Sequence, residues 1–172
     1  PIYRWPDHLA KRLMAASGTR LGVANLGIAG NRVLSDGAGV SALARFDRDV
    51  VAQPNAAFVV FMEGINDVGL VRGGPRPKVE DLIAGHKQVI ERAHARGLKI
   101  YAATLTPFEG VTIPNYWSEE GETTRQALNE WIRTSKAYDG VIDFDKLIRD
   151  PGNPRKIASQ FSSVDNLHPN DA

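Results

Sequence analysis

Residues 58–67 read FVVFMEGIND, and this stretch decides the fold class. Its first five residues are continuously apolar, which predicts a strand with both faces buried, as in a parallel sheet covered by helices. The polar residues that follow lie at the carboxyl end of the predicted strand. Ligands of open α/β sheets bind outside the carboxyl ends of the strands. The stretch therefore predicts an α/β fold and places a candidate site directly after this strand.

The chain on both sides of this stretch alternates between helical and strand-like patterns. Residues 79–96 give the clearest helix, because apolar residues recur at helical spacing and Gly97 is a natural C-terminal stop. Such alternation predicts a three-layer sandwich with a central parallel sheet and helices on both faces. The other helices are expected at 4–16, 40–52 and 118–137, and the other strands at 21–26, 98–105 and 141–144.

Composition excludes several classes of function. The 172 residues predict one domain, and 21 basic against 20 acidic side chains, with no basic block, indicate no nucleic-acid partner. The chain has no cysteine, which excludes disulfides, thiolate metal sites and cysteine nucleophiles. No apolar run approaches the roughly 20 residues that span a bilayer. His8, His86 and His94 fall on predicted helices without a zinc-binding pattern, so we expect no metal.

Asn66 is the first candidate for chemistry. An asparagine just beyond a buried strand can point its side-chain NH2 into the cleft and donate a hydrogen bond to a developing oxyanion. The neighbouring Asp67 can cap a turn or hold the loop in shape. A simple polar turn is the alternative interpretation of this segment.

Gly30 is the second candidate, in the loop 25–31, which reads NLGIAGN. A glycine can bring its backbone N–H close to a reacting carbonyl, because no side chain blocks the approach. The alternative is a turn that needs glycine for its shape. A dinucleotide-binding loop fits less well, since the G-x-G start and the acidic residue at a following strand end are missing.

Asp165 and His168 are the third candidate, in the segment DNLHP at 165–169. An aspartate three residues before a histidine can fold back and accept the Nδ1 proton, which leaves Nε2 free to act as a general base. Pro169 restricts the backbone of His168 and stiffens the loop. An exposed polar turn is the alternative. Tyr116 and Trp117, in a long loop, either line a substrate cleft or pack locally.

The order of these motifs resembles that of the SGNH hydrolases, also called GDSL-like lipases, esterases or acylhydrolases, over essentially the whole chain. The resemblance implies an oxyanion hole from the Gly30 N–H and the Asn66 amide, and a Ser-His-Asp triad completed by Asp165 and His168. The segment TLTP at 104–107 is similar to a strand-end segment of the family.

The same resemblance implies a flavodoxin-like sheet and a serine ester hydrolase for small acyl esters, including acetyl esters of carbohydrates. It implies no metal or cofactor. Many relatives are exported, so a secreted or periplasmic protein is plausible by analogy.

One family motif is missing. None of the eight serines stands in a Gly-Asp-Ser context, and residues 1–6 resemble the stretch just after the nucleophile. We therefore expect residues 1–172 to form a single SGNH-hydrolase-like domain that is truncated at both ends. Without the family's central first strand, the neighbouring strands would have unpaired edges and the isolated chain would be poorly stable. The alternative function is a non-catalytic protein of the same fold that binds a glycan or another ligand.

Overall fold

The computed structural model describes residues 4–16, 18, 21–70 and 75–170. Its sheet contains three parallel strands in the order β1-β2-β3, with β1 at Phe58–Phe61, β2 at Lys99–Ala103 and β3 at Gly140–Ile142. Phe58 is paired with Lys99, and Tyr101 with Gly140. The expectations on the chain ends (1–3 and 171–172) and on Ser17 lie outside the described residues.

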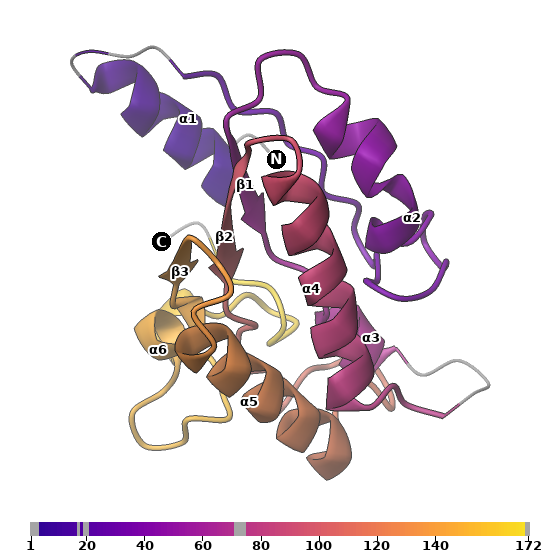
Figure 1. Ribbon diagram of the computed structural model, residues 1–172. Coiled ribbons are helices and arrows are strands. Elements are labelled where there is room, and N and C mark those ends of the chain that lie inside the picture. The colour runs from indigo at the N-terminus through magenta and orange to yellow at the C-terminus, as the bar shows by residue number, and fades with distance from the viewer. Residues whose placement is uncertain (1–3, 17, 19–20, 71–74, 171–172) are drawn as a thin grey trace.

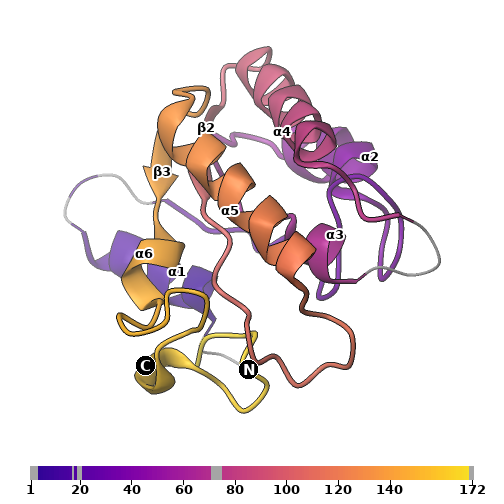
Figure 2. The ribbon, with the colours of Figure 1, turned by 90° about the horizontal axis from the view of Figure 1, so that it is seen from below.

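Helices cover both faces of this sheet, which confirms the predicted three-layer α/β architecture (Figures 1 and 2). Helices α2, α4 and α5 pack on one face, and α1 and α6 lie on the other. Helix α5 begins where the sequence predicts, because the Ser118 hydroxyl accepts a hydrogen bond from the Gly121 N–H at 3.0 Å. The helices are α1 (Trp5–Ala15), α2 (Ala42–Phe46, continued by a π-helical turn at Asp47–Val51), α3 (Ile65–Gly69), α4 (Val79–His94), α5 (Glu119–Thr134) and α6 (Phe144–Ile148), with a 3₁₀ turn at Ser159–Phe161.

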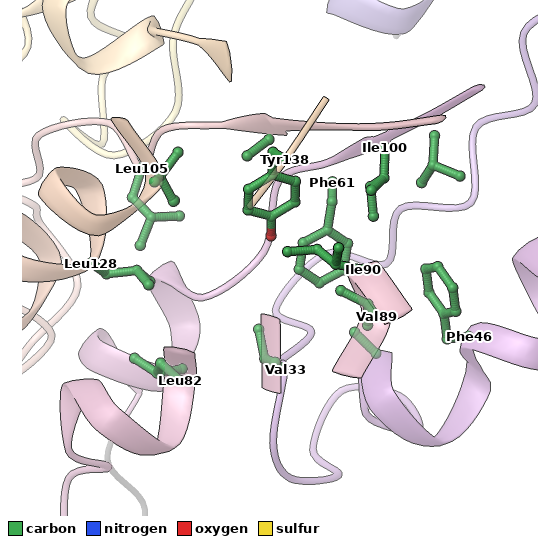
Figure 3. Close-up of a cluster of buried hydrophobic side chains, with 14 of the residues drawn as sticks. Val33, Phe46, Phe61, Leu82, Val89, Ile90, Ile100, Leu105, Leu128 and Tyr138 are labelled. Carbon is green, nitrogen blue, oxygen red and sulfur yellow. The ribbon is translucent and has the colours of Figure 1, made fainter. Parts of the chain in front are cut away.

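The main hydrophobic core lies between the sheet and helices α4 and α5 (Figure 3). Phe61 and Ile100 point from the strands toward Leu82, Val89 and Leu128 on the helices, and all five side chains are buried. The apolar spacing of residues 79–96 is thus the buried face of α4, as predicted. This core fixes the carboxyl ends of β1 and β2, from which the candidate site residues emerge.

The predicted strand at 21–26 is wrong. These residues form no regular element, and their side chains are exposed or half-buried. A strand exists only where a neighbouring strand supplies hydrogen bonds, and no described segment pairs with this one. Strand β1 likewise has only β2 as a partner among the described residues, and Phe58 at its start is 52% exposed.

Helix α1 confirms the predicted helix at 4–16, but it joins the core only weakly. Trp5 is 40% exposed and stacks at a tilt on Phe144 of α6, with 6.2 Å between ring centroids. Pro6 is the buried residue of this helix. None of the helices in the described part of the chain has the length and hydrophobicity required to cross a membrane.

Candidate functional site

Asn66 lies in the first turn of α3, just beyond the carboxyl end of β1. Gly64 makes the sharp turn between strand and helix, with a φ of 126° that side-chain-bearing residues rarely adopt. The Asn66 amide nitrogen donates to the carbonyl oxygen of Asn31 at 2.9 Å. Its oxygen accepts from the hydroxyl of Tyr116 at 2.8 Å. The side chain is therefore held from two sides.

Gly30 and Asn66 are brought together, because the Asn31 carbonyl that Asn66 contacts belongs to the residue after Gly30. Gly30 sits in a turn with a φ of 77°, and an added Cβ would stand 3.1 Å from the Cβ of Ala38. Among the described residues, no acceptor is bonded to the Gly30 N–H. A glycine N–H and a side-chain amide thus lie on segments that are joined by a hydrogen bond.

Asp67 links the loop after Gly30 to the helix that carries Asn66. Its two carboxylate oxygens accept from the backbone N–H groups of Val33, at 2.8 Å, and Leu34, at 3.1 Å. The side chain is buried, and burial raises the pKa of Asp67, whereas the two N–H donors oppose that rise. Asp67 therefore fastens the loop after Gly30 to helix α3.

Arg45 fastens the start of the same loop. Its guanidinium donates to the carbonyl of Leu26 at 2.7 Å and pairs with Glu63 at 3.4 Å. Burial raises the pKa of Glu63 to about 7, against the opposing attraction of Arg45, while nearby Asp67 adds to the rise. No local pattern in the sequence signals these contacts, because Arg45 lies 19 residues from Leu26 and 18 residues from Glu63.

Asp165 and His168 form the predicted pair on the C-terminal loop. The Nδ1 of His168 lies 2.6 Å from a carboxylate oxygen of Asp165, and it donates because a charged carboxylate can only accept. Partial burial alone would raise the pKa of Asp165, but hydrogen bonds from the His168 N–H, the Ser163 hydroxyl, the His168 ring and the Leu167 N–H lower it well below its usual range. Asp165 stays charged, and the His168 side chain, 68% exposed, offers Nε2 to solvent.

The loop between β2 and α5 joins the two pairs. The Thr112 N–H donates to the Asp165 carbonyl at 3.0 Å, and Asn166 donates to the Gly110 carbonyl at 3.1 Å. Further along the same loop, Tyr116 bonds Asn66. Within the residues that the structure describes, no hydrogen bond connects Gly30 or Asn66 directly to Asp165 or His168.

The described residues hold no group of three or more histidine, aspartate or glutamate side chains suited to a metal ion. The residues offer acid–base and electrostatic chemistry: an imidazole bonded to a charged carboxylate, and an amide donor that the same loop between β2 and α5 contacts. Such groups serve acyl transfer, in which a base takes a proton from the nucleophile and fixed donors stabilise an oxyanion.

The family model for GDSL-like lipases and acylhydrolases matches residues 2–172. The chain belongs to this family. The match covers every candidate residue, from Gly30 to His168, and confirms the resemblance drawn from the motifs. None of the curated proteins matches the sequence.

Solved structures of GDSL-family and esterase proteins share the fold of this GDSL-like chain. A G-D-S-L family protein from Desulfitobacterium hafniense is 20% identical, with a TM-score of 0.73 over 99% of this chain and 81% of its own. An aryl esterase from M. smegmatis is 15% identical, with a TM-score of 0.72 over 99% and 79%. Est24, a carbohydrate acetylesterase from Sinorhizobium meliloti, is 14% identical, with a TM-score of 0.71 over 99% and 78%.

Proposed function

We propose that this GDSL-like chain is part of a serine ester hydrolase, and that His168 is its general base. The observation that supports this most directly is the contact of 2.6 Å between the His168 Nδ1 and Asp165, on a loop tied to the one that holds Asn66. A donor amide and an oriented base together fit acyl transfer, because the base takes the proton of the nucleophile while the amide stabilises the oxyanion that forms on the ester.

In the proposed reaction the nucleophile is a serine outside residues 1–172, since no serine within them follows Gly-Asp. The Nε2 of His168 takes the hydroxyl proton as the serine oxygen bonds to the ester carbonyl carbon. Asp165 stabilises the imidazolium that forms. The Gly30 N–H and the Asn66 NH2 donate to the oxyanion. His168 then protonates the departing alcohol, and water releases the acid from the acyl-enzyme.

The proposed substrates are small acyl esters, with acetyl esters of carbohydrates as one subclass. The fold neighbours support this range, because an aryl esterase and a carbohydrate acetylesterase are among them. The serine, the imidazole with its carboxylate and the oxyanion donors together supply the groups for hydrolysis, so the proposal requires no metal or cofactor.

The test uses the full-length protein, p-nitrophenyl acetate and a phosphonate that labels activated serines. Intact mass and peptide sequencing should place the label on a Gly-Asp-Ser serine. Asn66→Ala should lower kcat by roughly 100-fold while changing KM little, because an oxyanion donor acts in the transition state. A raised KM with unchanged kcat would contradict the oxyanion role of Asn66.

The second candidate function is a non-catalytic protein of this fold that binds a glycan or another ligand. Its best support would be a natural protein that lacks a Gly-Asp-Ser serine altogether. A natural protein that neither reacts with the phosphonate nor hydrolyses the acetate would support this function. Conversely, stoichiometric labelling of one serine would reject it.

A further inference from the structure

Tyr116 is the one side chain from the loop between β2 and α5 that bonds Asn66. Its ring is 1% exposed and packs edge-on against Phe108, with centroids 5.9 Å apart. The hydroxyl donates to the Asn66 amide oxygen at 2.8 Å, and the Ile65 carbonyl lies further away at 3.4 Å. Burial raises the pKa of Tyr116, so its hydroxyl stays protonated and able to donate.

The neighbours of Asn66 determine which way its amide faces. The Asn31 carbonyl can only accept, so the amide group at 2.9 Å from it must be the NH2. The amide oxygen therefore faces Tyr116, whose hydroxyl supplies the matching donor. The nitrogen keeps a second N–H that Asn31 does not use, and this N–H is the one available to an oxyanion.

A close approach between helix and ring makes this contact possible. Gly69 ends helix α3, and a Cβ added there would lie 2.3 Å from a ring carbon of Tyr116. Since no side chain can occupy that space, the absence of a Cβ at residue 69 lets the ring lie against the helix that holds Asn66. The contact between Tyr116 and Asn66 thus also depends on Gly69, which lies far from Tyr116 in the sequence.

We propose that Tyr116 is a positioning residue for the Asn66 oxyanion donor, an inference that rests on the proposed hydrolase function. Its hydroxyl locks the amide with the NH2 toward the reaction site. A hydrogen bond to the amide oxygen also polarises the amide, which makes its N–H groups better donors. Tyr116 does not touch the substrate and acts through Asn66.

The test compares Tyr116→Phe with Tyr138→Phe in the full-length protein. Tyr138 is an apt control, since it is also buried and its hydroxyl bonds a neutral partner, the His86 Nδ1 at 2.6 Å, in the core beneath the sheet. We expect Tyr116→Phe to lower kcat on p-nitrophenyl acetate roughly tenfold, with KM within about twofold, because the amide loses orientation and polarisation. Tyr138→Phe should lower Tm and leave kcat within about twofold.

A double mutant separates positioning from general damage. In the Asn66→Ala background, Tyr116→Phe should cause less than about a twofold further fall in kcat, because the group it positions is gone. An unchanged kcat for Tyr116→Phe alone, or the same tenfold fall in both backgrounds, would overturn the inference while leaving the hydrolase function standing. Full activity of Asn66→Ala would instead reject the oxyanion role, and the positioning role with it.

Discussion

The two halves of the candidate site are built in opposite ways. The half with Gly30 and Asn66 is held by contacts between distant segments, such as Asp67 to Val33 and Tyr116 to Asn66. The half with Asp165 and His168 is a local turn: the aspartate bonds the ring and the N–H of a residue three positions away. Asp67 is buried, whereas the His168 side chain is 68% exposed.

The difference between distant and local contacts predicts in which half of the site a replacement changes both activity and stability. An exposed local turn contributes little to the free energy of folding, so its residues can be replaced at little cost in stability. A buried group with two backbone partners leaves unsatisfied donors when it is removed. We therefore expect replacements in the half with Asp165 and His168 to change mainly the rate, and replacements in the half with Gly30 and Asn66 to change the rate and the stability together.

His168→Ala should give the largest effect and the cleanest separation. Loss of the general base should lower kcat on p-nitrophenyl acetate by on the order of 10⁴-fold. Because the side chain is mostly exposed, Tm should stay within about 2 °C of the wild type. Parallel kinetics and thermal melts of the full-length protein check both values. A large fall in Tm would show that the exposed half is also structural.

Two carboxylates provide a matched comparison of the halves, since Asp67 and Asp165 each accept two backbone N–H bonds. Asp67→Ala leaves one buried and one part-buried donor unsatisfied and should lower the free energy of unfolding by about 3 kcal/mol. Of the donors to Asp165, the His168 N–H is exposed and the Leu167 N–H is part-buried, so Asp165→Ala should lower this free energy by only about 1 kcal/mol and still abolish most activity. Urea unfolding measures both, and equal losses would break the comparison.

The same contrast explains what the sequence could predict. The bond between Asp165 and His168 and the cap at Ser118 span three residues, so their spacing in the chain is their spacing in space. Strand β1 at 58–61 and helix α4 follow from local apolar patterns. Tyr116 lies 50 residues from Asn66, and no local pattern signals that contact.

The error at residues 21–26 has a related cause. An apolar run predicts the preference for a strand, but a strand also requires a neighbour, and the neighbour is a property of the whole fold. The φ of 77° at Gly30 fits the alternative interpretation of that residue, a turn that needs glycine, because turn residues depend on local backbone geometry. For residues 21–26 and for the contact of Tyr116 with Asn66, the sequence lacks the same information: which distant segment is the partner.

The two halves of the site also differ in how their carboxylates respond to pH. The pKa of Asp165 is lowered, so that carboxylate stays charged near neutral pH, while burial raises the pKa of Glu63 from 4.5 to about 7. Folded protein then binds more protons at Glu63 than unfolded protein does between these values, and this contribution to stability is lost as pH rises from 4.5 to 7. Burial lowers the pKa of His86 from 6.5 to about 4. The contribution of His86 therefore has the opposite sign, because it increases the stability of the fold as pH rises from 4 to 6.5.

Glu63→Gln isolates the first contribution, because glutamine keeps the size of the side chain and cannot ionise. The free energy of unfolding of the variant, relative to the wild type, should increase by about 2 to 3 kcal/mol between pH 4.5 and 7.5. Urea unfolding at a series of pH values measures this difference, and the His86 contribution cancels in it. A pH-independent difference would mean that Arg45 keeps Glu63 charged throughout. Arg45 and Glu63 would then form an ion pair at every pH tested, and this ion pair would hold the loop before Gly30. Like Asp165, Glu63 would then stay charged over this range of pH.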